Sequence, residues 1–250
     1  HMHSFKMIDH PNVTNCKLRG NPFHEAGEQV AELAGVDFIL NVVINKTRDL
    51  VAVVGGHHTL AHQAGCREVE KMSVRDMNEP VDLVVTSAGG YPLDATFYQV
   101  SKGLISAKNV LKPGGSIIIA CECREGLGSE EYCEMIRKGD SSDDFFNHYC
   151  QPEHFVIDQW CLQTTYQAMA HAAKIYVYSP YLEEADLNAL GMTKIEDIQT
   201  AVDMLLPTHP RVMASPEGPY VVGRIKPGVA GKEPEEARPE RVTPQQPAAG

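Results

Sequence analysis

Short apolar runs alternate with glycine-containing loops over residues 80–129, and this alternation constrains the possible folds more than any other feature of the chain. The runs at 81–86 and 116–121 are rich in β-branched residues and are bounded by proline or glycine, which is typical of buried strands. A helix is expected between them at 95–111, followed by a turn at 112–115, and another helix begins at Ser129. Strands that alternate with helices predict a parallel sheet, so the expected fold class is α/β with a Rossmann-like βαβ domain.

The loop after the first of these strands carries the pair Gly89-Gly90. Glycine allows positive φ angles and a close approach of backbone N–H groups to a ligand. Asp94 or Thr96 is a candidate cap for a helix that begins near Ala95. A strand end, a glycine turn and a helix N-terminus together predict a site for a small anion, with a plain strand-to-helix turn as the alternative.

Three polar residues of that expected helix, Tyr98, Gln99 and Lys102, lie within about two turns of one another. Their side chains are candidates for binding a small anionic substrate, whereas a solvated surface lysine is the alternative for Lys102. The loop reads Ser-Ala-Gly-Gly-Tyr-Pro and matches neither the G-x-G-x-x-G fingerprint nor a P-loop. The sequence therefore disfavours a nicotinamide-dependent oxidoreductase.

The first 75 residues show a different pattern. Asn21 followed by Pro22 predicts the cap and the first residue of a helix at 22–34. The residues of this helix expected to face the core are Val30, Leu33 and Ala34. Apolar runs at 37–44 and 50–54, separated by polar residues, predict a β-hairpin, and a second helix is expected at 59–71.

Residues 72–80 lose periodicity and mark the expected domain boundary. We therefore expect the hairpin-containing remnant of a first α/β domain at 3–75, a second α/β domain at 80–205 and a returning segment at 206–226. Residues 227–250 are rich in Pro, Glu, Ala and Gln and predict a disordered tail. Residues 1–2 resemble a cloning scar, so further residues are expected upstream.

Charge and cysteine usage narrow the class of protein. The net charge is −11, with 33 acidic against 22 basic residues and no basic stripe, which argues against nucleic-acid binding. No apolar run approaches the ~20 residues of a membrane span, and no signal pattern stands at the start. Seven cysteines without a C-x-x-C pair favour free thiols in a reducing compartment. We expect a soluble, cytoplasmic protein.

Three further groups of residues are candidates for a metal site or a binding pocket. His58 and His62 have the i,i+4 spacing of a zinc pair, but the glutamate of H-E-x-x-H is missing, which excludes the metalloprotease interpretation. Cys121 and Cys123 form a C-x-C, for which small apolar residues at a strand end are favoured over a metal site. Trp160, the single tryptophan, is either a core residue or the wall of a pocket.

Several separated motifs together resemble the nickel-dependent lactate racemase family. They are Gly20-Asn21-Pro22-Phe23-His24-Glu25, Phe38-Ile39-Leu40-Asn41-Val42-Val43, Ser87-Ala88-Gly89-Gly90-Tyr91-Pro92-Leu93-Asp94 with Phe97-Tyr98-Gln99 and Lys102-Gly103, Glu122-Cys123-Arg124-Glu125-Gly126-Leu127-Gly128, and Asp158-Gln159-Trp160. The match runs from residue 3 to about residue 223 and corresponds to the later part of the family's first domain plus its second domain.

The resemblance implies a nickel-pincer nucleotide, whose nickel is bound through carbon, sulfur and one protein histidine. In the family this cofactor takes the C2 hydride from a 2-hydroxy acid and returns it to either face, while two histidines act as general acid and base. By motif, His3 matches the nickel histidine. The residues that match the pocket are Tyr98, Gln99, Lys102 and Trp160, with Lys102 on the substrate carboxylate, and Gly89 and Gly90 are assigned to the same site.

The family's two catalytic histidines, its cofactor-tethering lysine and an early arginine have no match in this chain. The resemblance thus implies an isomerase, a 2-hydroxy acid racemase or epimerase with lactate as the default substrate, of which this chain carries half an active site and is inactive alone. The expected partners are the missing upstream part of its own chain and the cofactor-synthesis proteins. The alternatives are a non-catalytic module that binds a small anion and a nicotinamide-dependent Rossmann-like oxidoreductase.

Overall fold

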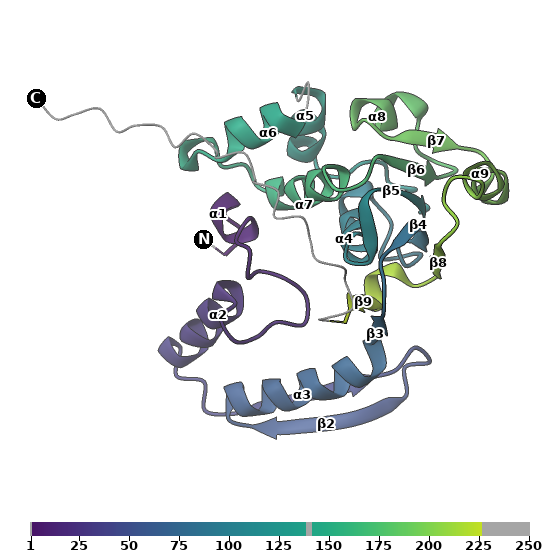
Figure 1. The fold of residues 1–250 in the computed structure, drawn as a ribbon. Coiled ribbons are helices and arrows are strands. Elements are labelled where there is room, and N and C mark those ends of the chain that lie inside the picture. The colour runs from purple at the N-terminus through teal and green to yellow at the C-terminus, as the bar shows by residue number, and fades with distance from the viewer. Residues whose placement is uncertain (1, 139–141, 227–250) are drawn as a thin grey trace, which may run out of the picture.

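A five-stranded, fully parallel sheet organises the larger part of the molecule. The computed structural model describes residues 2–138 and 142–226 (Figure 1). The strand order is β7-β6-β5-β4-β8. The strands are β4 (Val81–Ser87), β5 (Leu111–Ala120), β6 (Lys174–Tyr178), β7 (Thr193–Ile195) and β8 (Val212–Ser215). This architecture confirms the predicted α/β, Rossmann-like class.

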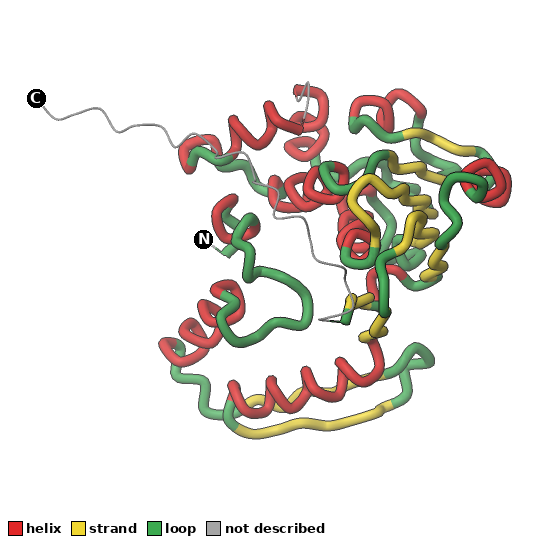
Figure 2. Tube along the Cα trace, in the orientation of Figure 1, coloured by secondary structure: helices red, strands yellow, loops and turns green. Residues whose placement is uncertain are grey.

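Helices cover both faces of this sheet (Figure 2). They are α4 (Ser101–Lys108), α5 (Glu130–Lys138), α6 (Ser142–Tyr149), α7 (Gln159–Met169), α8 (Glu184–Ala189) and α9 (Ile198–Leu205). Successive side chains of a strand point to opposite faces. Ile117 and Ile119 of β5 therefore join the main core with α4 and α7, whereas Ile118 packs with Ala201 and Leu205 of α9. The result is a three-layer α/β/α arrangement.

Most of the N-terminal part lies beside this domain (Figure 1), whereas α1 (Phe5–Ile8) packs into it, because Phe5 joins the main core and its carbonyl accepts a hydrogen bond from Gln163. The N-terminal part consists of α1, α2 (Pro22–Leu33), the hairpin β1 (Ile39–Ile44) and β2 (Leu50–Gly56), and α3 (His58–Ser73). Asn21 caps α2, because its Oδ1 accepts hydrogen bonds from the N–H groups of Phe23 and His24. The predicted cap, hairpin and helices are thus confirmed.

The prediction that α2 turns apolar residues toward a core is wrong. Val30 and Leu33 are 59% and 88% exposed, and Ala34 is exposed as well. Phe38, Leu40 and Val53 of the hairpin region are also more than half exposed. Helical periodicity identifies which face of a helix is apolar, but it carries no information about what packs there.

Two short strands join the N-terminal part to the sheet domain. The aperiodic segment 72–80 contains β3 (Val74–Met77), which pairs in parallel with β9 (Val222–Ile225). Arg224 reinforces the pair through ion pairs with Asp76 and Glu70. A four-residue strand is too short to show a period, which is why the pattern of the sequence missed it. The predicted tail at 227–250 lies outside the described residues.

Other element boundaries differ from the sequence prediction. Strand β5 begins at Leu111, and the glycines at 114 and 115, predicted as a turn, belong to the strand where its pairing with β4 shifts register between Val81 and Leu83. A single 3₁₀ turn, η2 (Pro152–His154), precedes α7. Within residues 2–138 and 142–226, every helix is too short or too polar to cross a bilayer.

All seven cysteines are free thiols, as predicted. Cys121 and Cys123 are buried at the end of β5, inside the main core. A hydrogen bond with Cys121, together with burial, raises the pKa of the Cys123 thiol. Metal binding needs the thiolate, so this C-x-C behaves as a pair of small core residues.

Asp82 joins three strands of the sheet, and its carboxylate makes stability pH-dependent. Its oxygens accept hydrogen bonds from Lys112 Nζ of β5 and from the Arg211 N–H just before β8. These bonds, chiefly the one from Lys112, lower the pKa of Asp82 below the ordinary 3.8. Because the folded-state pKa is the lower one, this stabilisation is present above the unfolded-state pKa and is lost as pH falls through the folded-state value.

We expect Asp82→Asn to lower the free energy of unfolding at neutral pH by about 1–2 kcal/mol. The variant should also flatten the loss of stability between about pH 5 and pH 2. Urea unfolding at several pH values measures both effects. Asp37→Asn, at an exposed aspartate, is the matched control, and equal acid sensitivity of wild type and Asp82→Asn would contradict the assignment.

Candidate functional site

The loops that follow β4 and β5 are joined by backbone hydrogen bonds. Five N–H groups donate across at 2.9 Å: Cys123 to Asp94 O, Glu122 to Asp94 Oδ2, Glu125 to Ala95 O, Phe97 to Gly126 O, and Tyr98 to Leu127 O. Ser179, just after β6, adds a hydrogen bond from its hydroxyl to Glu122 O. Three strand ends therefore hold Tyr98 in a defined position at the carboxyl edge of the sheet.

The helix expected from Ala95 begins later and in a different form. A 3₁₀ turn, η1 (Phe97–Val100), precedes α4, and neither Asp94 nor Thr96 caps it. The Asp94 carboxylate accepts from the Glu122 N–H instead. The first two N–H groups of η1 donate hydrogen bonds to the neighbouring loop. They are therefore not available to bind an anion at this helix N-terminus, where an anion site was predicted.

The glycine pair lies at the point where the strand order reverses, between β4 and β8. Gly89 and Gly90 have φ angles of +92° and +75°, as expected for this turn. The Gly89 N–H donates to Ser87 Oγ, and the Gly89 backbone packs against Pro219 and Tyr220. Gly89 therefore lies against η3 (Gly218–Tyr220), and the described contacts bring neither glycine to Tyr98 or Trp160.

Residues 216–220 fill the crevice in which open parallel sheets bind nucleotides, at the strand-order reversal. Ser87 Oγ donates to Pro216 O at 2.6 Å. A Cβ atom at Gly218 would lie 2.4 Å from Ser87 O, so this backbone rests directly on the end of β4. The usual dinucleotide position is thus taken by the chain itself.

A row of aromatic side chains in contact connects the N-terminal segment to the sheet domain. The His3 ring lies 5.0 Å from the Trp160 ring and 5.8 Å from the Phe23 ring, measured between centroids. Trp160 in turn meets the edge of Tyr98 at 5.9 Å. Residues 157 positions apart in the sequence thereby face one another, and His3, Tyr98 and Trp160 form one cluster.

The start of α7 positions Trp160. Asp158 adopts a left-handed conformation with φ +70°, and its Oδ2 accepts a hydrogen bond from Ser129 Oγ. Ser129 also caps α5 by accepting from the Tyr132 N–H. The buried Gln159 accepts from the Val156 N–H through Oε1. The hydrogen bonds of Asp158 and Gln159 therefore fix the start of α7, and the Trp160 indole stays partly exposed beside His3.

Burial keeps the phenol of Tyr98 protonated. Burial, with a hydrogen bond to Cys161, raises the pKa of Tyr98. Burial also raises the pKa of the Cys161 thiol to about 11, against the opposing effect of its hydrogen bonds with Tyr98 and Ser101. Near neutral pH this cluster contains neutral hydroxyl and thiol groups, which suits hydrogen bonding and not nucleophilic attack.

Gln99 and Lys102, which are close in sequence to Tyr98, also carry polar atoms without partners among the described residues. Gln99 Oε1 is buried without a hydrogen-bond partner among the described residues. Lys102 is exposed and forms no ion pair or hydrogen bond with any residue in 2–138 or 142–226. The Lys102 charge acts on the thiol of Cys161, the residue after Trp160. An ammonium group suits an anion, and the amide oxygen suits a hydrogen-bond donor such as a hydroxyl group.

Two residues of this region were not recognised from the sequence as candidate site residues. Asp94, considered only as a cap, is 2% exposed, and its Oδ1 has no hydrogen-bond partner among the described residues. Cys161 follows Trp160 directly and touches both Tyr98 and Ser101. The sequence could have indicated Asp94, because it lies between a glycine loop and a pair of aromatic residues. No neighbouring residue of Cys161 distinguishes it from an ordinary core cysteine.

The candidate zinc pair, His58 and His62, has different partners in the structure. His58 lies beside Glu32 and His57, whereas His62 stacks on His24 at 5.3 Å and contacts Cys66. A cavity of about 820 Å³ opens between α2, α3 and the hairpin, and its lining includes His24, His62 and Cys66. None of the predicted site residues lines it, so this cavity and the aromatic cluster are separate features.

The chain is similar to known lactate racemases. The family model described as the lactate racemase C-terminal domain matches residues 77–218. The lactate racemase of Thermoanaerobacterium thermosaccharolyticum is 30% identical over 229 residues, which are 90% of this chain and 53% of that protein. The lactate racemase of Lactiplantibacillus plantarum is 29% identical over 177 residues, 70% of this chain and 42% of that protein.

The fold agrees with these sequence matches. The structure of the lactate racemase apoprotein from T. thermosaccharolyticum superposes with a TM-score of 0.83 at 29% identity, covering 89% of this chain and 54% of that one. The chain thus spans about half the length of the relatives it matches. The family predicted from the separated motifs is confirmed: the chain belongs to the lactate racemase family.

Proposed function

We propose that this chain forms one wall of the active site of a 2-hydroxy acid racemase or epimerase, an isomerase with lactate as the default substrate. The observation that carries the proposal is the cluster of His3, Trp160 and Tyr98. The Lys102 ammonium, unpaired among the described residues, acts electrostatically on Cys161 next to Trp160. Family membership supports the proposal, because the relatives are named lactate racemases. Activity requires further residues, since the chain spans about half of those relatives.

The donor set fits a nickel-pincer nucleotide. His3 would supply the nickel-binding imidazole, and Tyr98 and Trp160 would wall the cofactor. Gln99 Oε1, buried and without a partner among the described residues, would accept a hydrogen bond from the bound molecules. When bound, the cofactor would accept the C2 hydride of the substrate and return it. Gly89 and Gly90 remain proposed contributors through the shape of the loop.

Lys102 is proposed to hold the substrate carboxylate and so orient C2, because its ammonium is unpaired among the described residues and its charge acts on Cys161 next to Trp160. The general acid and base are proposed to be histidines of the upstream part of the chain, which would close the site from the opposite side. Loading would depend on cofactor-synthesis proteins as partners. A cytoplasmic location is proposed from the free thiols.

Two alternatives are less well supported. A nicotinamide-dependent enzyme needs the crevice at the strand-order reversal, and residues 216–220 fill it. A non-catalytic anion-binding module would use Lys102 and Gln99 but would have no use for His3 beside Trp160. Nickel content separates this module from the racemase.

Cofactor loading is expected to quench the fluorescence of Trp160. The chain has one tryptophan, so its emission reports only on this site. After co-expression with cofactor-synthesis enzymes, we expect nearly one nickel per chain by mass spectrometry and weaker emission than in the unloaded protein, because nickel held by His3 would lie against the indole.

His3→Gln should lose both the nickel and the quenching, whereas His154→Gln, an exposed histidine that stacks on His148, should lose neither. A wild-type chain without nickel would favour the module if the full-length protein, in which this chain is joined to the upstream half, is also empty. Nickel retained fully by His3→Gln would reject His3 as the ligand.

A further inference from the structure

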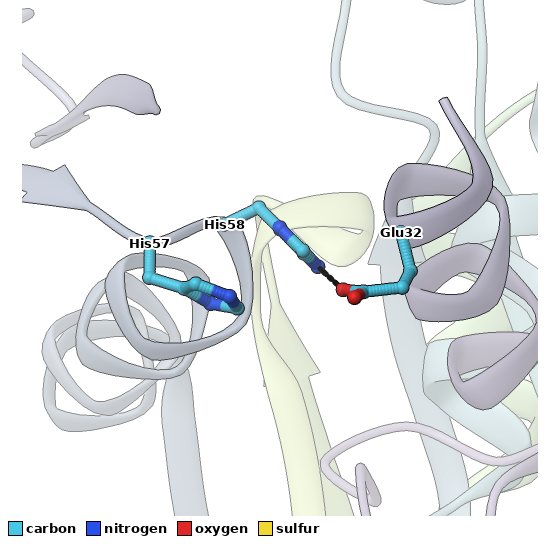
Figure 3. Close-up of side chains that lie close together, drawn as sticks. All are labelled: Glu32, His57 and His58. Carbon is cyan, nitrogen blue, oxygen red and sulfur yellow. Dashed lines mark ion pairs between the residues drawn. The ribbon is translucent and has the colours of Figure 1, made fainter. Parts of the chain in front are cut away.

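Glu32, His57 and His58 gather where the end of α2 meets the start of α3 (Figure 3). One ligand atom from each residue lies within 4.8 Å of the other two. His58 Nε2 is 3.7 Å from Glu32 Oε2, and the rings of His57 and His58 stack at 4.3 Å. This cluster is separate from the His3 cluster and from the residues that line the large cavity.

Both ring nitrogens of His58 face oxygen acceptors. The residue is 7% exposed, and its Nδ1 lies 3.3 Å from Val36 O on the side opposite Glu32. A neutral imidazole carries one proton, so it can satisfy only one of the two acceptors. If Nδ1–H donates to Val36 O, the Nε2 lone pair faces the Glu32 carboxylate, an arrangement that needs a cation between them.

The hydrogen bond to Val36 O is also the support that metal-binding histidines commonly have. A ligating imidazole usually donates its other N–H to a carbonyl or carboxylate, which fixes the ring and the tautomer. His57 offers a second imidazole nitrogen to the same cluster.

We propose that Glu32, His57 and His58 bind a divalent transition-metal cation, Zn²⁺, in an open site completed by water. Two imidazoles and a carboxylate are a ligand set that zinc uses, with bonds of about 2.0–2.2 Å. The 3.7 Å separation between His58 and Glu32 is close to the ligand spacing that such bonds produce. The exposed side chains of Glu32 and His57 can close the remaining gap without moving the buried ring.

The bound metal would tether α2. This helix has no buried residue, so side-chain packing holds it weakly. Its second residue, Phe23, packs edge-on against His3. A metal bridge between the far end of α2 and α3 would therefore steady the helix that supports the aromatic cluster.

Zinc titration of the metal-free chain by calorimetry tests the proposal. We expect one saturable site and a rise in Tm with zinc. Glu32→Gln and His57→Gln change exposed side chains, so they should fold normally by circular dichroism. Each should weaken zinc binding at least about tenfold, because even indirect partners of metal ligands contribute 10- to 100-fold. Cobalt substitution should give the strong visible bands of four-coordinate Co²⁺ in the wild type only.

His62→Gln is the matched control, one turn further along α3 and beside the rival pair of His24 and Cys66. It should bind zinc like the wild type. The proposal is overturned if zinc does not bind, if Glu32→Gln and His57→Gln bind as tightly as the wild type, or if His62→Gln causes the loss. A protonated His58 that pairs with Glu32 without a metal would give the first of these results.

Discussion

Lys102→Met is expected to raise the KM for lactate roughly 10- to 150-fold, the range for losing a charge-assisted hydrogen bond. The measurement needs an active protein, which is obtained by joining this chain to the upstream half of the T. thermosaccharolyticum relative and loading the nickel cofactor. Lys102 is exposed and unpaired among the described residues, so the substitution removes a charge without breaking an internal contact.

Lys194→Met is the control, because it removes the same charge from β7, the edge strand at the far side of the sheet. Lys102→Arg should retain part of the affinity, since the positive charge stays but its geometry changes. An unchanged KM in an active Lys102→Met protein would contradict the carboxylate assignment. The 250-residue chain alone is expected to show no racemisation, and measurable turnover by it would refute the half-site proposal.

Gly103→Val is expected to destabilise the fold by about 3 kcal/mol, through overpacking against backbone. A Cβ at Gly103 would lie 2.8 Å from Ser87 O and 3.0 Å from Ile119 Cδ1. Helix α4 can approach the end of β4 only because this position has no side chain. The clash would push α4 away from the sheet and would displace Lys102 and Gln99 with it.

Thermal unfolding should show the change as a fall in Tm of roughly 6–12 °C. Gly27→Val is the matched control, because it also lies within a helix but a Cβ there would meet only Met2 Cε at 3.9 Å. This control should change Tm little, since valine and glycine differ modestly in helix propensity. A similar Tm for both variants would show that the close approach of α4 contributes little.

Local patterns predicted those elements whose backbone bonds are made nearby. The cap at Asn21, the hairpin and helix α3 were recovered because each depends on neighbouring residues. The start of α4 was not recovered. The N–H groups of Phe97 and Tyr98 donate hydrogen bonds to carbonyl groups of another loop, those of Gly126 and Leu127. Propensity cannot reveal a competing partner about 30 positions away.

The residues of the candidate site also divide into those that the local sequence indicates and those that only packing brings together. Tyr98, Gln99 and Lys102 were recognisable because they are close in sequence, and family motifs added Trp160 and His3. Their roles remain predictions. The contact between His3 and Trp160 and the unpartnered oxygen of Asp94 depend on packing. The filling of the crevice by residues 216–220 also requires the whole sheet to be in place.

The sequence by itself determined the α/β class, the glycine loop at the end of β4 and the family, because periodicity, turn residues and motif order are properties of the chain. Only the tertiary structure decided which of these features meet. It brought His3 to Trp160, paired β3 with β9 and separated His58 from His62. Contacts between distant residues depend on how packed elements approach one another, and no local pattern encodes that geometry.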